Sequence, residues 1–272
     1  MTLQTADGYQ LHTIHWLPTG ETKAVVVLVH GIAEHSGRYN HVAQHLNQHG
    51  YAVHSYDHVG HGQSEGLRVY FDDLQQPVRH LAQFINHVRD DHPDSKLFLY
   101  GHSMGSLISL LYTLEHQDQL AGLILSGIPL NLDEKVPEFL IRLNALLDKA
   151  IPRLPLTPFS GEVVSRDPAQ VTKYVRDPLV YTGPVRVRMS HFHLNQSRYA
   201  RTRLDQLSLP LLILHGGSDS ICPYSGSHSV YAGSKSKDKT VRVFGALYHE
   251  IHNEPEQAEV LAAITEWLDA RS

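Results

Sequence analysis

The segment LFLYGHSMGS at residues 97–106 contains a G-x-S-x-G pattern centred on Ser103. The pattern alone is weak evidence for a nucleophile, because glycine and serine are common residues. Its surroundings strengthen it: residues 97–100 have the length and bulk of a buried strand, and leucines recur at helical spacing after it. A strained turn between strand and helix lifts a serine Oγ clear of the sheet. We therefore predict that Ser103 is a nucleophile and that Gly101 and Gly105 relieve crowding around the turn.

A serine hydroxyl is a poor nucleophile at neutral pH, so it needs an imidazole to accept its proton and a carboxylate to orient that imidazole. In chains with such a turn, the acid and the base follow the serine, each in a loop after a late strand. Asp219 follows the strand-like LPLLILHG, and His249 follows TVRVFG. We predict these two residues as the partners of Ser103. The alternatives are a turn-forming aspartate and an ordinary surface or core histidine; His252 is a weaker candidate for the base.

The segment HGIAEHSGRY at residues 30–39 supplies a further part of the predicted site. It places a His-Gly turn at the end of a strand, where a backbone N–H group can face a developing negative charge. The N–H groups of Ile32 and of Met104, the residue after the nucleophile, would together form a two-donor oxyanion hole. A plain loop between a strand and a helix is the alternative.

Strand-like and helix-like segments alternate along the chain, and this alternation indicates how the residues are positioned. Residues 5–17 are compatible with a hairpin, and AVVVLVHG is typical of a buried strand that ends at a glycine turn. Further strand-like segments follow as YAVHSYD, LFLY, AGLILSG, LPLLILHG and TVRVFG. Helical stripes separate most of these strands, and a closing helix begins near Pro255. The pattern predicts an α/β fold with a mainly parallel central sheet and helices on both faces.

The alternation breaks between the fourth and fifth of the parallel strands, over about eighty residues with several prolines. We interpret residues 128–207 as an inserted cap, and residues 1–127 and 208–272 as the core that carries the predicted site.

Composition limits the classes of partner. The chain has 272 residues, of which 42% are hydrophobic, and a net charge of -5, so we expect a globular protein without a nucleic-acid partner. Cys222 is the only cysteine, which excludes an intrachain disulfide and is compatible with a reducing compartment. The first residues lack a basic leader with an apolar core, and no apolar run approaches the length of a bilayer span. We expect a cytoplasmic protein.

Five motifs resemble, in order and spacing, those of the monoacylglycerol lipases, which are serine hydrolases of the α/β-hydrolase superfamily. They are HGIAEHSGRY, YDHVGHGQSEG, GHSMG, GSDSIC and SKDKTVRVFGALYHEIHNE. The resemblance runs from about residue 24 to 254 and is weak across the cap. It implies the α/β-hydrolase fold, no cofactor and no metal, and hydrolysis of a small lipid ester through an acyl-serine intermediate.

The resemblance also implies roles for single residues. The triad would be Ser103, Asp219 and His249, with Ile32 and Met104 as oxyanion donors. A small polar chamber for the glycerol head group would be lined by Glu34, Arg38 and His252.

Asp57, His58 and His61 would be architectural in such proteins. We prefer this interpretation to a metal site, because a glycine-rich loop does not align the two histidines and no further ligand completes a zinc set. Two departures from the pattern, Ile32 after the His-Gly pair and Ser106 after the elbow, leave the catalytic groups in place and affect the shape of the acyl channel.

Three other functions remain open at this point. A lysophospholipase or a broad carboxylesterase would use the same chemistry, although a charged phosphocholine fits poorly beside Glu34 and Arg38. A ligand-binding protein without activity is a further alternative on this fold. We disfavour it because such proteins often lose a triad member and this chain retains all three.

The cap contains an apolar stripe at helical spacing, flanked by charged residues. It consists of Val136, Leu140, Leu143, Leu147 and Ile151, widened by Phe139 and Leu146. Such a face is commonly buried against a core. Because the substrate must leave a bilayer or micelle, we expect instead that the stripe roofs the acyl channel and makes transient contact with a membrane or micelle surface. The protein would then be peripheral at membranes.

Overall fold

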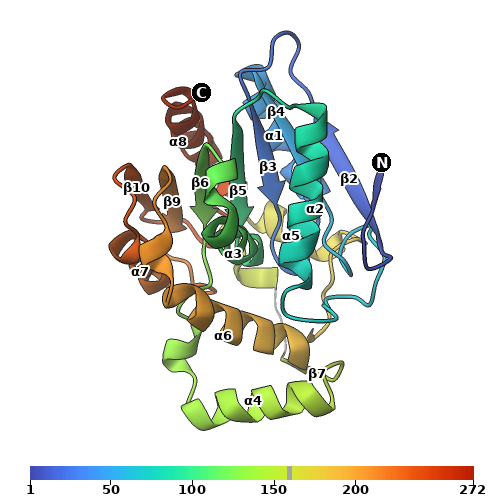
Figure 1. Cartoon of the computed structure of the whole chain (residues 1–272). Helices are drawn as coiled ribbons and strands as arrows, with labels where there is room; N and C mark the ends of the chain where they lie inside the picture. Colours follow the sequence, from blue (N-terminus) through green and yellow to red (C-terminus); the bar gives the residue numbers. More distant parts are fainter. Residues whose placement is uncertain (158–160) are drawn as a thin grey trace.

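A computed structural model describes residues 1–157 and 161–272 of the chain (Figure 1). Its centre is an eight-stranded sheet in the order β1-β2-β4-β3-β5-β6-β9-β10. Pairing is antiparallel between β1 and β2 and between β2 and β4, and parallel elsewhere in this sheet. The strands are β1 (Thr2–Gln4), β2 (Gln10–Trp16), β3 (Ala24–Val29), β4 (Tyr51–Tyr56), β5 (Leu97–His102), β6 (Gly122–Ser126), β9 (Leu211–Gly216) and β10 (Lys239–Phe244).

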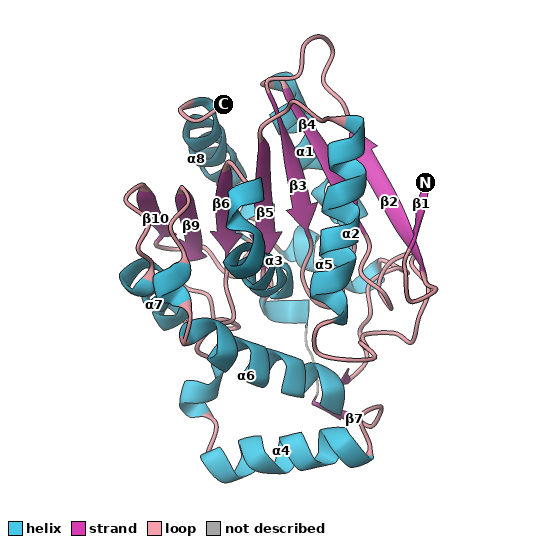
Figure 2. Ribbon diagram, in the orientation of Figure 1, coloured by secondary structure: helices cyan, strands magenta, loops and turns pink. Residues whose placement is uncertain are grey.

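The central strands are buried on both faces, which is why their sequences are continuously apolar rather than alternating. In β3, Val25 and Val27 belong to one hydrophobic cluster, whereas Val26 and Leu28 belong to the other. Helices α2 (Gln76–Asp91), α3 (Met104–His116) and α7 (Tyr224–Gly233) contribute to the first cluster. Helices α1 (Asn40–Gln48) and α8 (Gln257–Asp269) contribute to the second. The predicted fold class, a mainly parallel sheet between two helical layers, is therefore confirmed (Figure 2).

The elements between β6 and β9 form the region that we interpret as the cap. They include α4 (Glu138–Ala150), β7 (Pro155–Thr157), α5 (Pro168–Arg176), β8 (Val185–Arg186) and α6 (Val187–Arg201). Figure 1 shows α6 across the end of the sheet toward which β3, β5 and β6 point, with α4 on the far side of α6. Residues 158–160 of the expected cap lie outside the described residues.

Helix α4 has favourable residues at both ends and is little buried. Pro137 precedes its first turn, Glu138 lies at its positive end and Lys149 at its negative end, where each charge complements the helix dipole. Its buried residues are Ile141, Asn144 and Asp148. Four of its apolar side chains are exposed instead: Phe139, Leu140, Leu143 and Leu146. Within the described residues, no helix combines the length and the apolar character that a membrane span requires.

Candidate active site

Ser103 occupies a strained turn between β5 and α3. Its backbone has φ 52° and ψ -125°, a region that side-chain-bearing residues rarely adopt. The flanking glycines are required by close packing. A Cβ on Gly101 would lie 2.5 Å from the carbonyl oxygen of Gly105, and a Cβ on Gly105 would lie 2.1 Å from that of Val29. The expected relief of crowding is confirmed.

The serine that departs from the family pattern supports this turn. The Ser106 hydroxyl donates to the Ser103 carbonyl oxygen at 2.5 Å, and the Ser106 N–H donates to the same oxygen at 2.8 Å. Ser106 is fully buried, so this hydrogen bond satisfies its polar atom inside the core.

Ser103, His249 and Asp219 form one hydrogen-bonded chain. The Ser103 Oγ lies 2.8 Å from His249 Nε2, and His249 Nδ1 lies 2.7 Å from Asp219 Oδ2. The other carboxylate oxygen, Oδ1, accepts the N–H groups of Ile221 at 2.8 Å and Cys222 at 2.9 Å. These bonds orient the carboxylate, which in turn orients the imidazole with Nε2 toward the serine.

The electrostatics of the chain suit proton transfer. Burial by itself would lower the pKa of His249, but the charge of Asp219 and its hydrogen bond outweigh that effect and raise the pKa above its usual value. Burial would raise the pKa of Asp219, but the charge and hydrogen bond of His249 hold it below its usual value. The arrangement can therefore accept a proton from Ser103 and stabilise the resulting imidazolium.

The predicted oxyanion donors lie in the two turns next to Ser103. Met104 is the first residue of α3, where a backbone N–H has no acceptor within the helix. Ile32 lies in the loop after β3, where Ala33 has φ 67° and the Gly31 N–H donates to Glu34 Oε1 at 2.7 Å. A Cβ on Gly31 would lie only 3.1 Å from the Ser103 Cβ, so the loop approaches the serine closely because this position is glycine.

Arg38 joins two carboxylates beside the triad. It donates to Glu34 Oε2 at 2.6 Å and to both oxygens of Glu250 at 2.7 and 2.6 Å. The Tyr39 hydroxyl donates to Glu34 Oε1 at 2.7 Å, and the Arg38 guanidinium lies 4.5 Å from the centre of the Tyr174 ring. Burial would raise the pKa of Glu250, but Arg38 lowers it to about 2. For Glu34, burial and the nearby Glu250 raise the pKa despite Arg38.

Glu250 was not assigned by sequence reasoning, although it follows His249 directly. Its position after the predicted base was the only available signal, because its partner Arg38 is 212 residues away.

A small chamber adjoins Ser103 and His249, and two of the three predicted head-group residues lie outside its lining. Its volume of about 20 Å³ is room for roughly one water molecule. Glu34 lines it, together with Gly31, Ile32, His102, Ser103, Val164, Tyr174, Ile221, His249 and Glu250. Arg38 is hydrogen-bonded to Glu34 but lines a separate cavity. His252 is fully buried, stacked on Tyr39 at 4.7 Å between ring centres and edge-on to His102 at 4.8 Å.

A much larger cavity of about 560 Å³ also adjoins Ser103. Most of its lining is apolar and comes from the cap, including four residues of the predicted stripe. The lining residues are Ile32, Ser103, Pro129, Leu132, Val136, Leu140, Leu143, Asn144, Leu147, Leu156, Val185, Ser190, His193, Leu194, Ile221 and Cys222. A volume and lining of this kind are typical of a site for a small apolar ligand.

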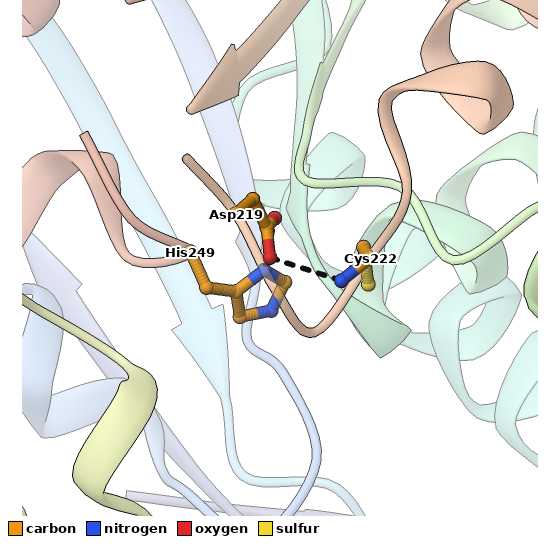
Figure 3. A group of neighbouring side chains, drawn as sticks. All are labelled: Asp219, Cys222 and His249. Carbon is orange, nitrogen blue, oxygen red and sulfur yellow. Dashed lines mark hydrogen bonds and ion pairs between the residues drawn. The ribbon is translucent and has the colours of Figure 1, made fainter. Parts of the chain in front are cut away.

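Asp57 and the group Asp219, Cys222 and His249 carry atoms that could ligate a metal. Asp57 accepts the N–H and hydroxyl of Ser36 at 2.8 and 2.6 Å and the N–H of Gln63 at 2.8 Å, so it holds loops together. Asp219, Cys222 and His249 have ligand atoms within 4.8 Å of one another, the only such group of three among the described residues (Figure 3). Burial and the charge of Asp219 raise the pKa of Cys222, which disfavours the thiolate that a metal needs.

This fold with such a site is that of a serine hydrolase of the α/β-hydrolase superfamily. The chain belongs to the family described as serine aminopeptidase S33, whose model matches residues 20–256.

Individual relatives agree with the resemblance seen in the motifs. The monoacylglycerol lipase of Mycolicibacterium smegmatis is 36% identical over 93% of this chain and 90% of its own. The monoglyceride lipase of Rattus norvegicus is 37% identical over 99% of this chain and 90% of its own. The crystal structure of the Paleococcus ferrophilus monoacylglycerol lipase matches with a TM-score of 0.86 and 32% identity, over 96% of this chain and 99% of that one.

Proposed function

We propose that this protein hydrolyses monoacylglycerols to a fatty acid and glycerol. The observation that carries the proposal is the pair of unequal spaces around Ser103: an apolar cavity of about 560 Å³ and a small chamber bordered by Glu34 and Glu250. A substrate with one apolar chain and one small polar group fits this asymmetry. The relatives named monoacylglycerol or monoglyceride lipase support the same substrate class.

The reaction would proceed in two steps. Ser103 Oγ attacks the ester carbonyl while His249 Nε2 takes its proton, and the N–H groups of Ile32 and Met104 hold the oxyanion. The tetrahedral intermediate collapses, the bond to the glycerol oxygen breaks, and the imidazolium gives its proton to that oxygen. Water then attacks the acyl-serine with the same base, which releases the fatty acid and restores the hydroxyl.

The chamber must widen before a glycerol group can enter. Three of its lining residues, Val164, Tyr174 and Ile221, belong with Val180 to a small hydrophobic cluster that is separate from the two main ones. We propose that displacement of this cluster makes room, while the ion pairs hold Glu34 in place as a hydrogen-bond acceptor for the hydroxyls. A bulky phosphocholine group would require a larger displacement.

The family description raises aminopeptidase activity as a second candidate. A free α-amino group is best recognised by a carboxylate without another cation. Both carboxylates that border the chamber are already ion-paired with Arg38. This pairing favours an uncharged head group over a peptide N-terminus.

We further propose that the cap contacts a membrane or micelle during substrate uptake and that the protein works in the cytoplasm. Exposed apolar residues on α4 support the first part, as Phe139 and Leu146 are 68% and 63% exposed. The buried free thiol of Cys222 is compatible with a reducing compartment.

The substrate assignment can be tested with one panel of substrates. kcat/KM is measured for monoacyl-, diacyl- and triacylglycerols, a lysophospholipid, a short-chain ester and an aminoacyl amide, all with wild-type protein and a Ser103→Ala control. We expect the monoacylglycerol to be preferred and the control to be inactive toward every substrate. A preference for the lysophospholipid or for the amide would overturn the proposed substrate, and a preference for the short-chain ester would make the protein a general carboxylesterase.

A further inference from the structure

A group of histidines lies on β2, on β4 and at the end of α2, away from the active site. Figure 1 labels these three elements. The Nε2 atoms of His54 and His92 face each other at 3.0 Å, with ring centres 5.0 Å apart and the rings nearly perpendicular. His15 is the cross-strand partner of His54, with ring centres 5.8 Å apart. Three imidazoles from β2, β4 and the end of α2 are thus gathered at one place.

A second observation concerns a small cavity at the same place. It has a volume of about 200 Å³, and its lining includes His15, His54, His87 and Asp91. His87 and Asp91 are four residues apart on α2, a spacing that places both on one face of the helix. His15, His87 and Asp91 are exposed, so their side chains can rotate, whereas His54 is buried and fixed.

We propose that this cluster is a binding site for a late first-row divalent metal ion such as Zn²⁺. Imidazole nitrogen is a preferred ligand of these ions. Two nitrogens 3.0 Å apart can share a metal at the usual Zn–N distance of about 2.0–2.1 Å with an N–metal–N angle of about 90°. Rotation of His15 would supply the third ligand, and water would complete the coordination.

The local chemistry favours the metal-binding form of the histidines. Without metal, one Nε2 carries the hydrogen that joins His54 to His92 and the other accepts it. With metal, that hydrogen moves to Nδ1 of the same ring. Both Nε2 lone pairs then face the ion, and neither ring releases a proton.

Metal binding here would stabilise the fold without entering the active site. His92 follows the last residue of α2, and His54 and His15 lie on adjacent strands, so the ion would join the end of this helix to the sheet. Ser103 lies beyond the end of β5, which is separated from β4 by β3. The expected consequence is a higher melting temperature at unchanged esterase activity.

The test uses protein without a histidine tag, titrated by calorimetry with Zn²⁺, Ni²⁺ and Mg²⁺. We expect one saturable site for Zn²⁺ and for Ni²⁺, no binding of Mg²⁺, and a rise in melting temperature that EDTA reverses. His92→Asn and the exposed variant His15→Ala should each weaken Zn²⁺ binding at least about tenfold. His228→Ala, an exposed histidine outside the cluster, should leave it unchanged.

Three results would overturn the proposal. They are the absence of saturable Zn²⁺ binding to the wild-type protein, binding that neither His15→Ala nor His92→Asn weakens, and binding that removes esterase activity and is lost in Cys222→Ala. The last result would place the ion at Asp219, Cys222 and His249 instead. Because His15 is exposed, its variant remains informative even if His92→Asn destabilises the protein.

Discussion

The outward face of α4 permits a sharp test of membrane contact. Phe139 and Leu146 are about two-thirds exposed. Neither of them lines the cavity of about 560 Å³ beside Ser103, which we call the acyl cavity. Leu143 and Leu147, on the same helix, do line the cavity. Phe139 and Leu146 thus face solvent without lining the cavity, whereas Leu147 and the 46% exposed Leu143 line it. The first pair can therefore be changed to perturb docking without altering the cavity wall.

The expected effect can be worked out from these exposures. Complete burial of such a side chain contributes roughly 1.5–3 kcal/mol, so two-thirds of it contributes about 1–2 kcal/mol per residue and about 2–4 kcal/mol for the pair. At about 1.4 kcal/mol per factor of ten, this corresponds to a loss of vesicle affinity of roughly 30- to 700-fold. Because the side chains need not insert completely, we expect Phe139→Asp with Leu146→Asp to weaken vesicle binding at least about tenfold.

The assay compares vesicle sedimentation with turnover of two substrates. The double variant should lose turnover of long-chain monoacylglycerol in vesicles while keeping turnover of a dispersed short-chain ester. Leu143→Asp and Leu147→Asp should instead lower the turnover of long-chain monoacylglycerol even when this substrate is dispersed in detergent and not in vesicles. Val243→Asp, an exposed apolar residue on β10, serves as the matched control. Unchanged vesicle binding by the double variant, with an unchanged melting temperature, would refute the docking surface.

Three further predictions concern the triad and the neighbouring Cys222. Ser103→Gly should abolish turnover yet keep the melting temperature equal to or above that of wild type, because about 1–3 kcal/mol of backbone strain is relieved at φ 52°; a clear fall measured by calorimetry would contradict the strain. Activity requires neutral His249, so the raised pKa moves the midpoint of the rising pH–activity limb above about 6.5, and Asp219→Asn should lower that midpoint and reduce kcat by about 10⁴-fold. A profile highest at acidic pH would exclude this base. Bulky thiol reagents should partly inactivate the wild type through Cys222, which lines the acyl cavity, but not Cys222→Ala; equal inactivation of both would place the reaction elsewhere.

The sequence predicted the parts of the site that depend on local structure. Ser103 and Asp219 each follow a strand that can be recognised from its apolar run, and His249 follows the strand-like segment TVRVF. Parallel strands bring the loops at their carboxyl ends together at one end of the sheet. The hairpin expected over residues 5–17 is present, but its strands are Thr2–Gln4 and Gln10–Trp16, because the Asp-Gly signal locates a turn better than the strand ends.

The parts that escaped prediction depend on contacts between distant segments. Nothing local shows that Arg38 bridges Glu34 and Glu250, or that His252 packs between Tyr39 and His102. The chamber volume depends likewise on how the cap packs over the site. Helical periodicity located the apolar stripe on α4, but not which of its residues face the cavity, since that depends on α6 beneath it.

The central claim is that Ser103 is the nucleophile for monoacylglycerol hydrolysis, and covalent labelling tests it most directly. The protein is treated with a fluorophosphonate, and mass spectrometry locates the label while glycerol release from a monoacylglycerol is followed in parallel. The account predicts one phosphonyl group on Ser103, loss of glycerol release in proportion to labelling, slower labelling when monoacylglycerol is present, and neither label nor activity in Ser103→Ala. Glycerol release that persists at complete labelling of Ser103, or a label on another residue that accounts for the lost activity, would contradict it.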